Sequence, residues 1–252
     1  MSGVGQQFME NTRYRALGTS DQERGVPQPP LELEAPRGAI KLDDLPAPEN
    51  VALGQVPLRA VIDTRRSLRK YADDPLSLEE ISYLLWASQG VRSVVQPDRT
   101  MRSVPSAGAR HAFETLLLVN HVQGLEPGLY RFLATSHRLA LLPAPEDVSA
   151  RAAKAALGQQ MIARSAATFI WIAVPERMTW RYGERGYRYL HLDAGHVAQN
   201  LYLAAESIGA GICVIGAFTD EEMNELLGLD GESQFVIYLA SVGKRVRSAP
   251  GT

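Results

Sequence analysis

Apolar residues recur with two different periods through residues 58–247 of the chain. Short runs rich in β-branched and aromatic residues predict strands, because such side chains pack well on a pleated, buried surface. These runs are Phe113–Asn120, Thr168–Val174, Gly211–Phe218 and Gln234–Val242, and a hairpin is predicted from Gly128–Phe132 and His137–Leu142.

Apolar residues at spacings of three and four predict the helices. They are a short helix opened by Pro57, then Leu78–Gln89, Ala150–Leu157, Leu190–Ile208 and Asp220–Leu227. Ser77 and Glu80 form a capping-box pattern before the second of these helices, and Thr219 is expected to cap the last. Leu190–Ile208 is apolar on more than one face, which indicates burial in a core or in a dimer interface.

Residues 1–57 show little hydrophobic periodicity and contain several prolines. Such a stretch forms few backbone ladders and cannot build its own core. Two alternatives are a disordered segment and an extended arm lying on another surface. Leucine and isoleucine residues spaced between Leu31 and Leu45 favour the arm. Residues 92–102 are expected to form a polar loop, and residues 248–252 a C-terminal tail.

Composition excludes several classes of protein. The chain has 252 residues, of which 45% are hydrophobic, and a formal net charge of −2, so no global basic field argues for nucleic acid. Apolar runs fall far short of the roughly 18 residues of a membrane span, and no secretory signal is recognisable, so we expect a cytoplasmic protein. The single cysteine, Cys213, excludes an internal disulfide and is expected to lie in the core.

A strongly basic run, Arg65-Arg66-Ser67-Leu68-Arg69-Lys70-Tyr71, lies between two predicted helices. Guanidinium groups suit phosphate oxygens, and a hydroxyl or backbone N–H can complete such a site. The alternative is a solvated basic loop. A second basic pair, Lys244-Arg245, follows the last predicted strand, and the two can meet only in three dimensions.

Two further segments carry candidate chemistry. Pro105, Ser106, Ala107 and Gly108 leave little side-chain bulk, so their backbone can approach a flat ligand, although a tight turn before a strand is the simpler alternative. The segment Trp180–Tyr189 mixes aromatic and cationic side chains. These could line a substrate opening, because aromatics stack on flat rings and arginines bind carboxylates or carbonyls, or they could form a half-buried surface.

A glycine turn at Ile215, Gly216 and Ala217 ends a predicted strand. The preceding glycines do not form a dinucleotide-binding fingerprint, because the order is helix, glycines, strand. His191, Asp193 and His196 suggest a metal site on a predicted helix. The two histidines lie five residues apart and point in different directions, so we predict no metal site there.

Four motifs occur in order: Arg65–Tyr71, Pro105–Gly108, Gly216–Phe218 and Gly243–Arg245. This set resembles the FMN-dependent nitroreductase superfamily over about residues 58–247. Further phrases are similar to its branch of thiazoline/oxazoline peptide dehydrogenases, the SagB-type dehydrogenases. They are Asn11–Tyr14, Gly128–Tyr130, Tyr182–Tyr189, Gly195-His196 and Gln199–Leu201.

The resemblance implies an α+β fold with a central, mostly antiparallel sheet flanked by helices. It also implies a homodimer with FMN at the interface and the long helix in the dimer core. Arg65 and Ser67 would hold the FMN phosphate, Arg66 would contribute through its backbone, and Lys244 and Arg245 would close on it.

The remaining implied contacts concern the flavin ring. Arg69 would lie near the ribityl chain and the N1–C2 edge, where positive charge stabilises the anion of the reduced ring. The loop Pro105–Gly108 would pack on the isoalloxazine across the dimer interface. The backbone of Gly216 or its neighbour would donate to N5, the atom that accepts hydride.

Arg181 and Tyr182 are the candidate catalytic residues, at the place where the peptide-dehydrogenase branch would have a Lys-Tyr pair. Arginine stays protonated and is a poor general base, whereas Tyr182 can serve as an acid or base. This difference argues against azoline oxidation. Gly216 likewise departs from classical nitroreductases, which would carry an acidic residue nearby.

Three functions remain as alternatives. The first is an FMN-dependent oxidoreductase acting on a small organic substrate, with NAD(P)H as a possible transient electron donor. The second is an FMN-dependent dehydrogenase of azoline-containing peptides. The third is a non-catalytic flavin-binding dimer. No nucleic-acid or membrane partner is expected, and fold-level analogy does not name the substrate.

Overall fold

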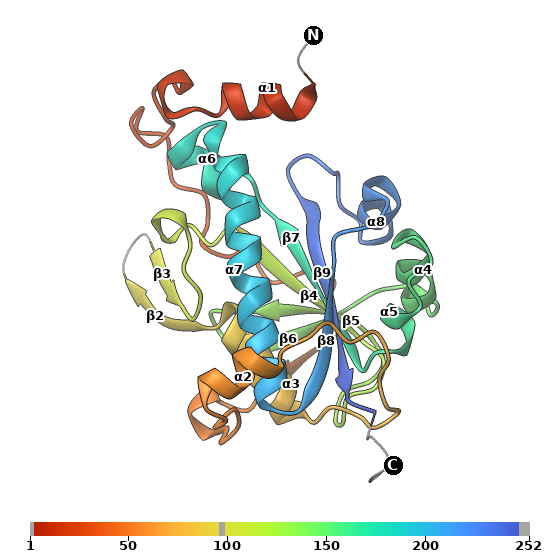
Figure 1. Ribbon diagram of the computed structural model, residues 1–252. Coiled ribbons are helices and arrows are strands. Elements are labelled where there is room, and N and C mark those ends of the chain that lie inside the picture. The colour runs from red at the N-terminus through yellow and green to blue at the C-terminus, as the bar shows by residue number, and fades with distance from the viewer. Residues whose placement is uncertain (1–2, 96–98, 247–252) are drawn as a thin grey trace.

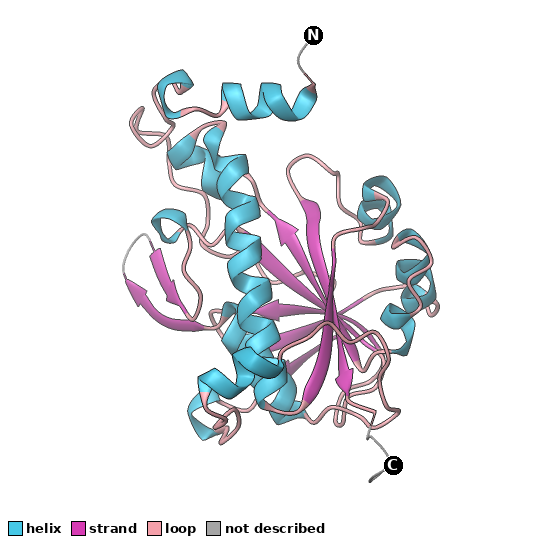
Figure 2. Ribbon diagram, in the orientation of Figure 1, coloured by secondary structure: helices cyan, strands magenta, loops and turns pink. Residues whose placement is uncertain are grey.

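The computed structural model describes residues 3–95 and 99–246, which form a seven-stranded sheet with helices on both faces (Figures 1 and 2). The strand order is β1-β6-β5-β4-β7-β9-β8, and every neighbouring pair is antiparallel. The predicted α+β fold with a mostly antiparallel sheet is confirmed. The strands are β1 Lys41–Asp44, β4 Phe113–Val119, β5 Gly128–Leu133, β6 Arg138–Leu142, β7 Ala167–Ala173, β8 Ala210–Ile215 and β9 Phe235–Lys244.

Helices α3 and α7 cover one face of the sheet, and α4, α5 and α8 cover the other. Helix α2 packs beside the C-terminal half of α7, and α6 leads into the start of α7 (Figure 1). The helices are α1 Val4–Asn11, α2 Leu58–Thr64, α3 Leu78–Gln89, α4 Val148–Ala155, α5 Met161–Arg164, α6 Glu176–Tyr182, α7 Arg185–Ser207 and α8 Asp220–Leu226.

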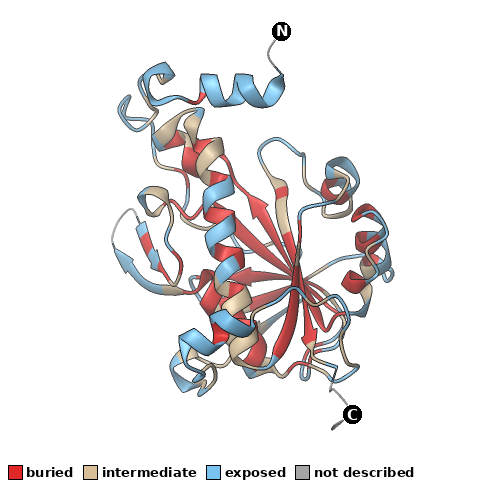
Figure 3. Cartoon of the chain, in the orientation of Figure 1, coloured by how far each residue is buried: buried red, intermediate tan, exposed pale blue. Residues whose placement is uncertain are grey.

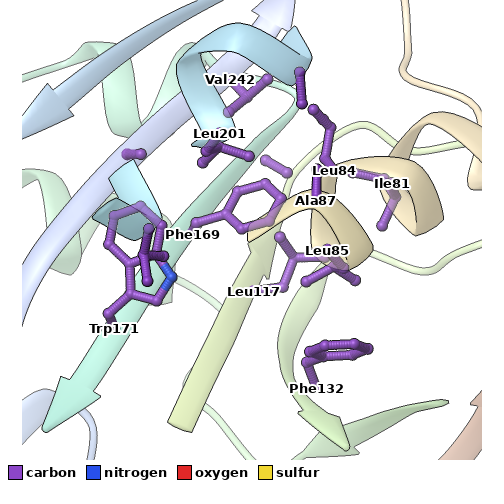
Figure 4. Close-up of a cluster of buried hydrophobic side chains, with 14 of the residues drawn as sticks. Ile81, Leu84, Leu85, Ala87, Leu117, Phe132, Phe169, Trp171, Leu201 and Val242 are labelled. Atoms are coloured by element: carbon purple, nitrogen blue, oxygen red, sulfur yellow. The ribbon is translucent and has the colours of Figure 1, made fainter. Parts of the chain in front are cut away.

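Two cores follow from the alternation of side chains along the central strands. Phe169 and Trp171 of β7 point toward α3 and α7, where they meet Leu201 (Figure 4). Ile170 and Ile172, which alternate with them, pack against α4, α5 and α8. Both faces of the central strands are therefore buried (Figure 3).

Local capping signals predicted some helix ends correctly. Helix α3 has the predicted bounds, and Ser77 and Glu80 form the reciprocal capping box. Thr219 occupies the predicted N-cap position of α8, but its side chain makes no capping hydrogen bond. Its backbone N–H donates instead to Ala155 O, at 2.8 Å, which ties α8 to α4.

The long helix begins five residues earlier than predicted, and a separate helix, α6, precedes it. A Cβ atom on Gly186 would lie 2.9 Å from the backbone nitrogen of Thr179, so only glycine allows α6 and α7 to approach this closely. The mixed aromatic and cationic pattern of residues 180–189 concealed this helix pair, because several long side chains there are only half-buried. Among the described residues, no helix is long and apolar enough to cross a membrane.

The predicted polar loop at residues 92–102 is wrong. Strands β2, Val91–Val95, and β3, Arg99–Arg102, form a separate antiparallel pair. Thr100 and Arg102 are buried while their neighbours are exposed, and Arg102 Nη1 donates to Gln89 Oε1 at 3.1 Å. A charged side chain can therefore occupy the buried face of a strand when a buried partner accepts its hydrogen bond.

The N-terminal segment lies across several elements of the sheet. It contributes α1 and the edge strand β1, which pairs with β6. Between these elements, the buried Arg177 donates from Nε to Pro30 O at 2.8 Å. Arg131, also buried, donates to Leu33 O and Glu34 O, each at 2.8 Å. Buried arginines thus satisfy carbonyls of residues 30–34, which belong to no strand. The predicted tail, residues 248–252, lies outside the described residues, as does residue 247.

Candidate functional site

The basic run docks on the ends of the last two strands of the sheet. Ser67 forms a parallel bridge with Ile212 of β8, and Leu68 N donates to Ile212 O at 2.8 Å. Ala72 N donates to Lys244 O at 2.9 Å, so the run reaches the end of β9. The backbone of the run is therefore fixed rather than solvated.

Two glycines make this docking sterically possible. Gly211 and Gly243 are register partners on β8 and β9. A Cβ on Gly243 would lie 2.8 Å from Cγ of Tyr71, and one on Gly211 would lie 3.0 Å from Cδ1 of Leu68. The Tyr71 hydroxyl donates to Leu68 O at 2.8 Å and lies 2.7 Å from Ser241 Oγ, and burial raises the pKa of Tyr71.

One turn of α7 brings the two basic segments together. The Tyr202 hydroxyl lies 2.7 Å from Ser67 Oγ, and its ring centroid is 5.1 Å from the guanidinium carbon of Arg65. Glu206, one turn later, forms an ion pair with Arg245. Arg65, Ser67 and Arg245 therefore meet beside α7, although about 180 residues of chain separate them.

The cationic side chains of the basic run and of the pair Lys244-Arg245 differ in whether a carboxylate pairs with them. Among residues 3–95 and 99–246, no carboxylate forms an ion pair with Arg65, Arg66, Arg69 or Lys70. Lys244, in contrast, pairs with Glu80 of the α3 capping box. Neighbouring like charges without a partner favour a bound polyanion, and guanidinium forks suit phosphate oxygens.

The loop Pro105–Gly108 meets the predicted catalytic pair. Gly108 has a φ of 57°, in the left-handed region that glycine adopts readily. A Cβ there would lie 2.5 Å from the Tyr182 hydroxyl and 3.1 Å from Arg181 Cδ. Ser106 Oγ accepts a hydrogen bond from His111 N at 2.9 Å. The loop and the pair therefore form one surface.

Aromatic and guanidinium groups extend this surface toward the N-terminal segment. The rings of Tyr182 and Tyr189 meet edge to face, with centroids 4.8 Å apart. The guanidinium of Arg185 lies 5.2 Å from the Tyr189 ring and 5.6 Å from the Tyr14 ring. Arg185 Nη1 also donates to Thr12 O at 2.9 Å. Sequence reasoning missed Tyr14 and Thr12 as neighbours of this surface, because the contact joins distant parts of the chain.

The glycine turn lies at the other end of β8 from Ala210. Ile215 is buried, while Gly216 and Ala217 are exposed. A Cβ on Gly216 would lie 3.3 Å from the Tyr238 ring, and Ala217 O accepts from Gln159 Nε2 at 2.9 Å. The exposed turn therefore follows the end of β8 that is opposite the meeting point of Arg65, Ser67 and Arg245, which we call the basic cluster.

Sequence reasoning also missed Tyr202 and Glu206, and it considered Asp193 only as a metal ligand. All three are polar residues of α7, which faces the sheet with an apolar surface. A polar residue at a buried helical position is the signal that could have found Asp193, which is 4% exposed. Cys213 is buried in β8, which confirms its predicted place in the core.

Comparison with known proteins adds an independent line of evidence. The sequence profile of the nitroreductase family matches residues 62–244. The chain is 38% identical over 192 residues to the candidate nitroreductase MJ1384 of Methanocaldococcus jannaschii, a match covering 76% of this chain and 93% of the archaeal protein. It is 30% identical over 163 residues to the trifolitoxin-processing protein TfxB of Rhizobium leguminosarum bv. trifolii, spanning 62% of this chain and 44% of TfxB.

The fold is also similar to that of a solved structure, a candidate nitroreductase of Ralstonia eutropha JMP134. The TM-score is 0.68 at 25% identity, and the match covers 88% of this chain and 100% of the other. The predicted resemblance to the nitroreductase superfamily is thereby confirmed. The chain belongs to the nitroreductase family, whose members are oxidoreductases that use a flavin.

Proposed function

We propose that the chain is an FMN-dependent oxidoreductase of nitroreductase type, acting on a small organic substrate with NAD(P)H as a possible electron donor. The observation that carries this proposal is the meeting of Arg65, Ser67 and Arg245 beside one turn of α7, in a chain of this family. When bound, FMN supplies hydride transfer at its N5 atom, so the protein needs no nucleophile of its own.

We assign the phosphate to the basic cluster. Arg65 and Ser67 would bind its oxygens, Arg66 would donate its backbone N–H, and Arg245 would add a second guanidinium. The absence of carboxylate partners for Arg65 and Arg66 among the described residues supports this fit. Lys244 and Arg245 are paired with Glu80 and Glu206, and both would add positive charge beside the phosphate.

The residues that would contact the isoalloxazine ring are Arg69, the glycine turn Ile215–Ala217 and the loop Pro105–Gly108. Arg69 would place positive charge near the N1–C2 edge, where it favours the reduced ring. The exposed Gly216 turn would donate a backbone N–H toward N5. The loop Pro105–Gly108 would pack on the ring face across the dimer interface, and Tyr182 with Arg181 would face the substrate. Tyr182 would supply or accept a proton, and Arg181 would remain a fixed positive charge.

A homodimer with FMN at its interface is part of the proposal. Large apolar side chains are exposed on neighbouring helices: Leu58 and Ile62 of α2 are 62% and 55% exposed, and Leu192 of α7 is 56% exposed. The outward side of α7 carries a row of exposed residues (Figure 3). Exposed apolar residues on packed helices are typical of an interface, and a second copy of the chain would cover them.

One observation favours the second candidate, a dehydrogenase of azoline-containing peptides: the similarity to TfxB, which is named for trifolitoxin processing. The cationic and aromatic surface from Arg181 to Tyr14 would suit a peptide, because arginines bind carbonyls and tyrosines stack on flat rings. The arginine at position 181 counts against it. The third candidate is a flavin-binding dimer without catalytic activity.

The absorbance spectrum of the purified protein tests the proposal. We expect the two visible bands of a flavin, and heat should release FMN rather than FAD. NAD(P)H oxidation with a quinone acceptor, compared with turnover of an azoline peptide, then separates the first two candidates. Flavin without turnover of either substrate would favour the third. A colourless protein that gains no FMN on titration would exclude all three.

Arg65→Ala is expected to weaken FMN binding by roughly 1.5–3 kcal/mol, the range for hydrogen bonds to charged groups, or about 10- to 150-fold in Kd. Titration by flavin fluorescence measures this change. Arg59→Ala is the matched control, because Arg59 is an exposed arginine on the neighbouring helix α2. Equal affinity of the two variants would show that Arg65 does not hold the FMN phosphate.

A further inference from the structure

Asp193 is a buried carboxylate inside the longest helix of the molecule. It is 4% exposed, and the neighbouring buried positions of α7, such as Leu190 and Ala194, are apolar. Burial raises the pKa of Asp193 above its ordinary value. Removing a carboxylate from water costs free energy unless hydrogen bonds compensate for it, so its partners define what this residue does.

The partners of Asp193 belong to the loop Pro105–Gly108. Ala107 N donates to both carboxylate oxygens, each at 3.3 Å, and the Ser106 side chain lies near the same group and lowers its pKa in opposition to burial. His196 Nδ1 lies 3.8 Å from Oδ1 and is half-exposed. The loop and α7 are joined here by a charged group, whereas most of the helix packs through apolar side chains.

This loop has a backbone that needs such support. Gly108 at its end and two residues just after it, Ala109 and His111, lie in the left-handed region, with φ of 57°, 54° and 44°, and two of these three are not glycine. Left-handed non-glycine residues cost free energy and persist only where surrounding contacts hold them. Ser106 Oγ and Arg110 Nε supply contacts within the loop, the latter donating to Gly108 O at 3.0 Å. Asp193 supplies the contact from outside the loop.

A second polar residue of the same helix holds the chain just before the loop. Asn200 lies seven residues after Asp193, so both residues fall on one side of α7. Its Nδ2 donates to Ala87 O at 3.0 Å and approaches Ser103 O at 3.5 Å. The segment 103–107 is therefore attached to α7 near both of its ends.

On its other side the loop touches the candidate catalytic pair, because Gly108 abuts Tyr182 and Arg181. We propose that Asp193 is a positioning residue, which holds the loop Ser106–Gly108 against the flavin ring and so sets the place of Tyr182. This inference rests on the proposed function for the part that concerns the flavin. The part that concerns the loop rests on the hydrogen bonds alone.

Hydrogen exchange of the peptide 103–111, measured on the full chain without added FMN, tests the inference. We expect Asp193→Ala to speed exchange at Ala107 roughly tenfold or more, the factor for losing a hydrogen bond to a charged group. Asp193→Asn keeps an acceptor oxygen in the same place and should stay within about threefold of the unaltered chain. Unchanged exchange in Asp193→Ala, or equally fast exchange in both variants, overturns the inference.

Two further measurements complete the test. Asp193→Val removes the acceptor of the Ala107 N–H and leaves an apolar side chain of similar size at this buried position, so it should also speed exchange at Ala107 and decides the question if Asp193→Ala does not fold. With FMN added, Asp193→Ala should change the visible circular dichroism of the flavin and weaken its binding about tenfold, while Asp193→Asn restores both. Loosened exchange in a protein that binds no FMN would refute the proposed function and leave the role of Asp193 in the loop standing. Loosened exchange with unaltered FMN binding and dichroism would refute the positioning role.

Discussion

Replacing Glu114 with glutamine is expected to lower the free energy of unfolding by roughly 3–5 kcal/mol, the cost of leaving buried charges without their partner. Glu114, on β4, is 4% exposed and pairs with two buried arginines, Arg131 and Arg177. Its Oε1 also accepts from Leu33 N at 2.9 Å. Glutamine keeps the shape of the side chain but removes the negative charge and turns an N–H₂ group toward a guanidinium.

The same substitution should loosen the N-terminal segment. Arg177 donates to Glu114 from Nη2 and to Pro30 O from Nε. Arg131 donates from Nη2 to both Glu114 and Leu33 O, and from Nη1 to Glu34 O. Without the carboxylate, both guanidinium groups lose the partner that orients them toward this segment. We therefore expect faster proteolysis near residues 28–40 as well as lower stability.

Thermal unfolding followed by circular dichroism measures the main effect. The expected fall in midpoint is roughly 6–20 °C, for a chain of this size and a loss of that magnitude. Glu146→Gln is the control, because Glu146 is an exposed glutamate in a loop. A midpoint for Glu114→Gln that matches the control would mean that water or a rearranged arginine already screens the buried charge.

His111 is expected to make the protein lose stability between pH 6.5 and about 3. Burial lowers the pKa of His111 to about 3, and the neighbouring cations Arg102, Arg110 and Arg177 add to this effect. In this range the unfolded chain binds a proton that the folded chain does not, so stability falls as the pH falls. The full difference corresponds to roughly 4–5 kcal/mol, of which about 2 kcal/mol is lost between pH 7 and pH 5.

The variant His111→Asn should remove this part of the pH dependence. Asparagine tolerates the positive φ of 44° at this position and does not titrate. Urea unfolding at pH 7 and at pH 5 should show a drop that is about 2 kcal/mol smaller than in the unaltered chain. Some slope should remain, because burial also lowers the pKa of His137.

His191→Asn serves as the control for this experiment, since His191 is an exposed histidine of α7. Its pH dependence should match that of the unaltered chain. If His111→Asn also keeps the full drop between pH 7 and pH 5, then His111 is protonated in the folded protein and its surroundings are wetter than its burial indicates.

Much of the local structure could be predicted from the sequence. Helix α3 was predicted to the residue, because Ser77, Glu80 and Gly90 are local signals that act within one or two turns. The central strands were found within about two residues at each end, because β-branched and aromatic runs reflect burial on both faces. Helix α6, the start of α7 and the strands β2 and β3 were missed, because their inward positions hold glycine, threonine and arginine rather than apolar residues.

The basic cluster shows where local reasoning stops. The chemistry of Arg65–Tyr71 and the small size of Pro105–Gly108 were evident along the chain, and their order pointed to the nitroreductase family. Adjacent residues Lys244 and Arg245 looked equivalent, yet only Arg245 reaches α7 beside Arg65, while Lys244 pairs with Glu80. Side-chain direction at the end of a strand depends on pleat and register, which the sequence motif does not contain.

The sequence by itself determined which residues carry the cationic and hydroxyl groups that suit a phosphate, where most of the strands and helices lie, and the family to which the chain belongs. Tertiary structure alone decided which of these residues meet. The register of β8 with β9 pairs Gly211 with Gly243 and so opens the surface on which Tyr71 and the basic run dock. Helix α7 crosses the sheet, and this brings Tyr202, Glu206 and Asp193 into contact with residues that are distant in the sequence. Those residues are Ser67, Arg245 and Ala107. Such contacts depend on long-range packing, and local propensities and motif spacing carry no information about it.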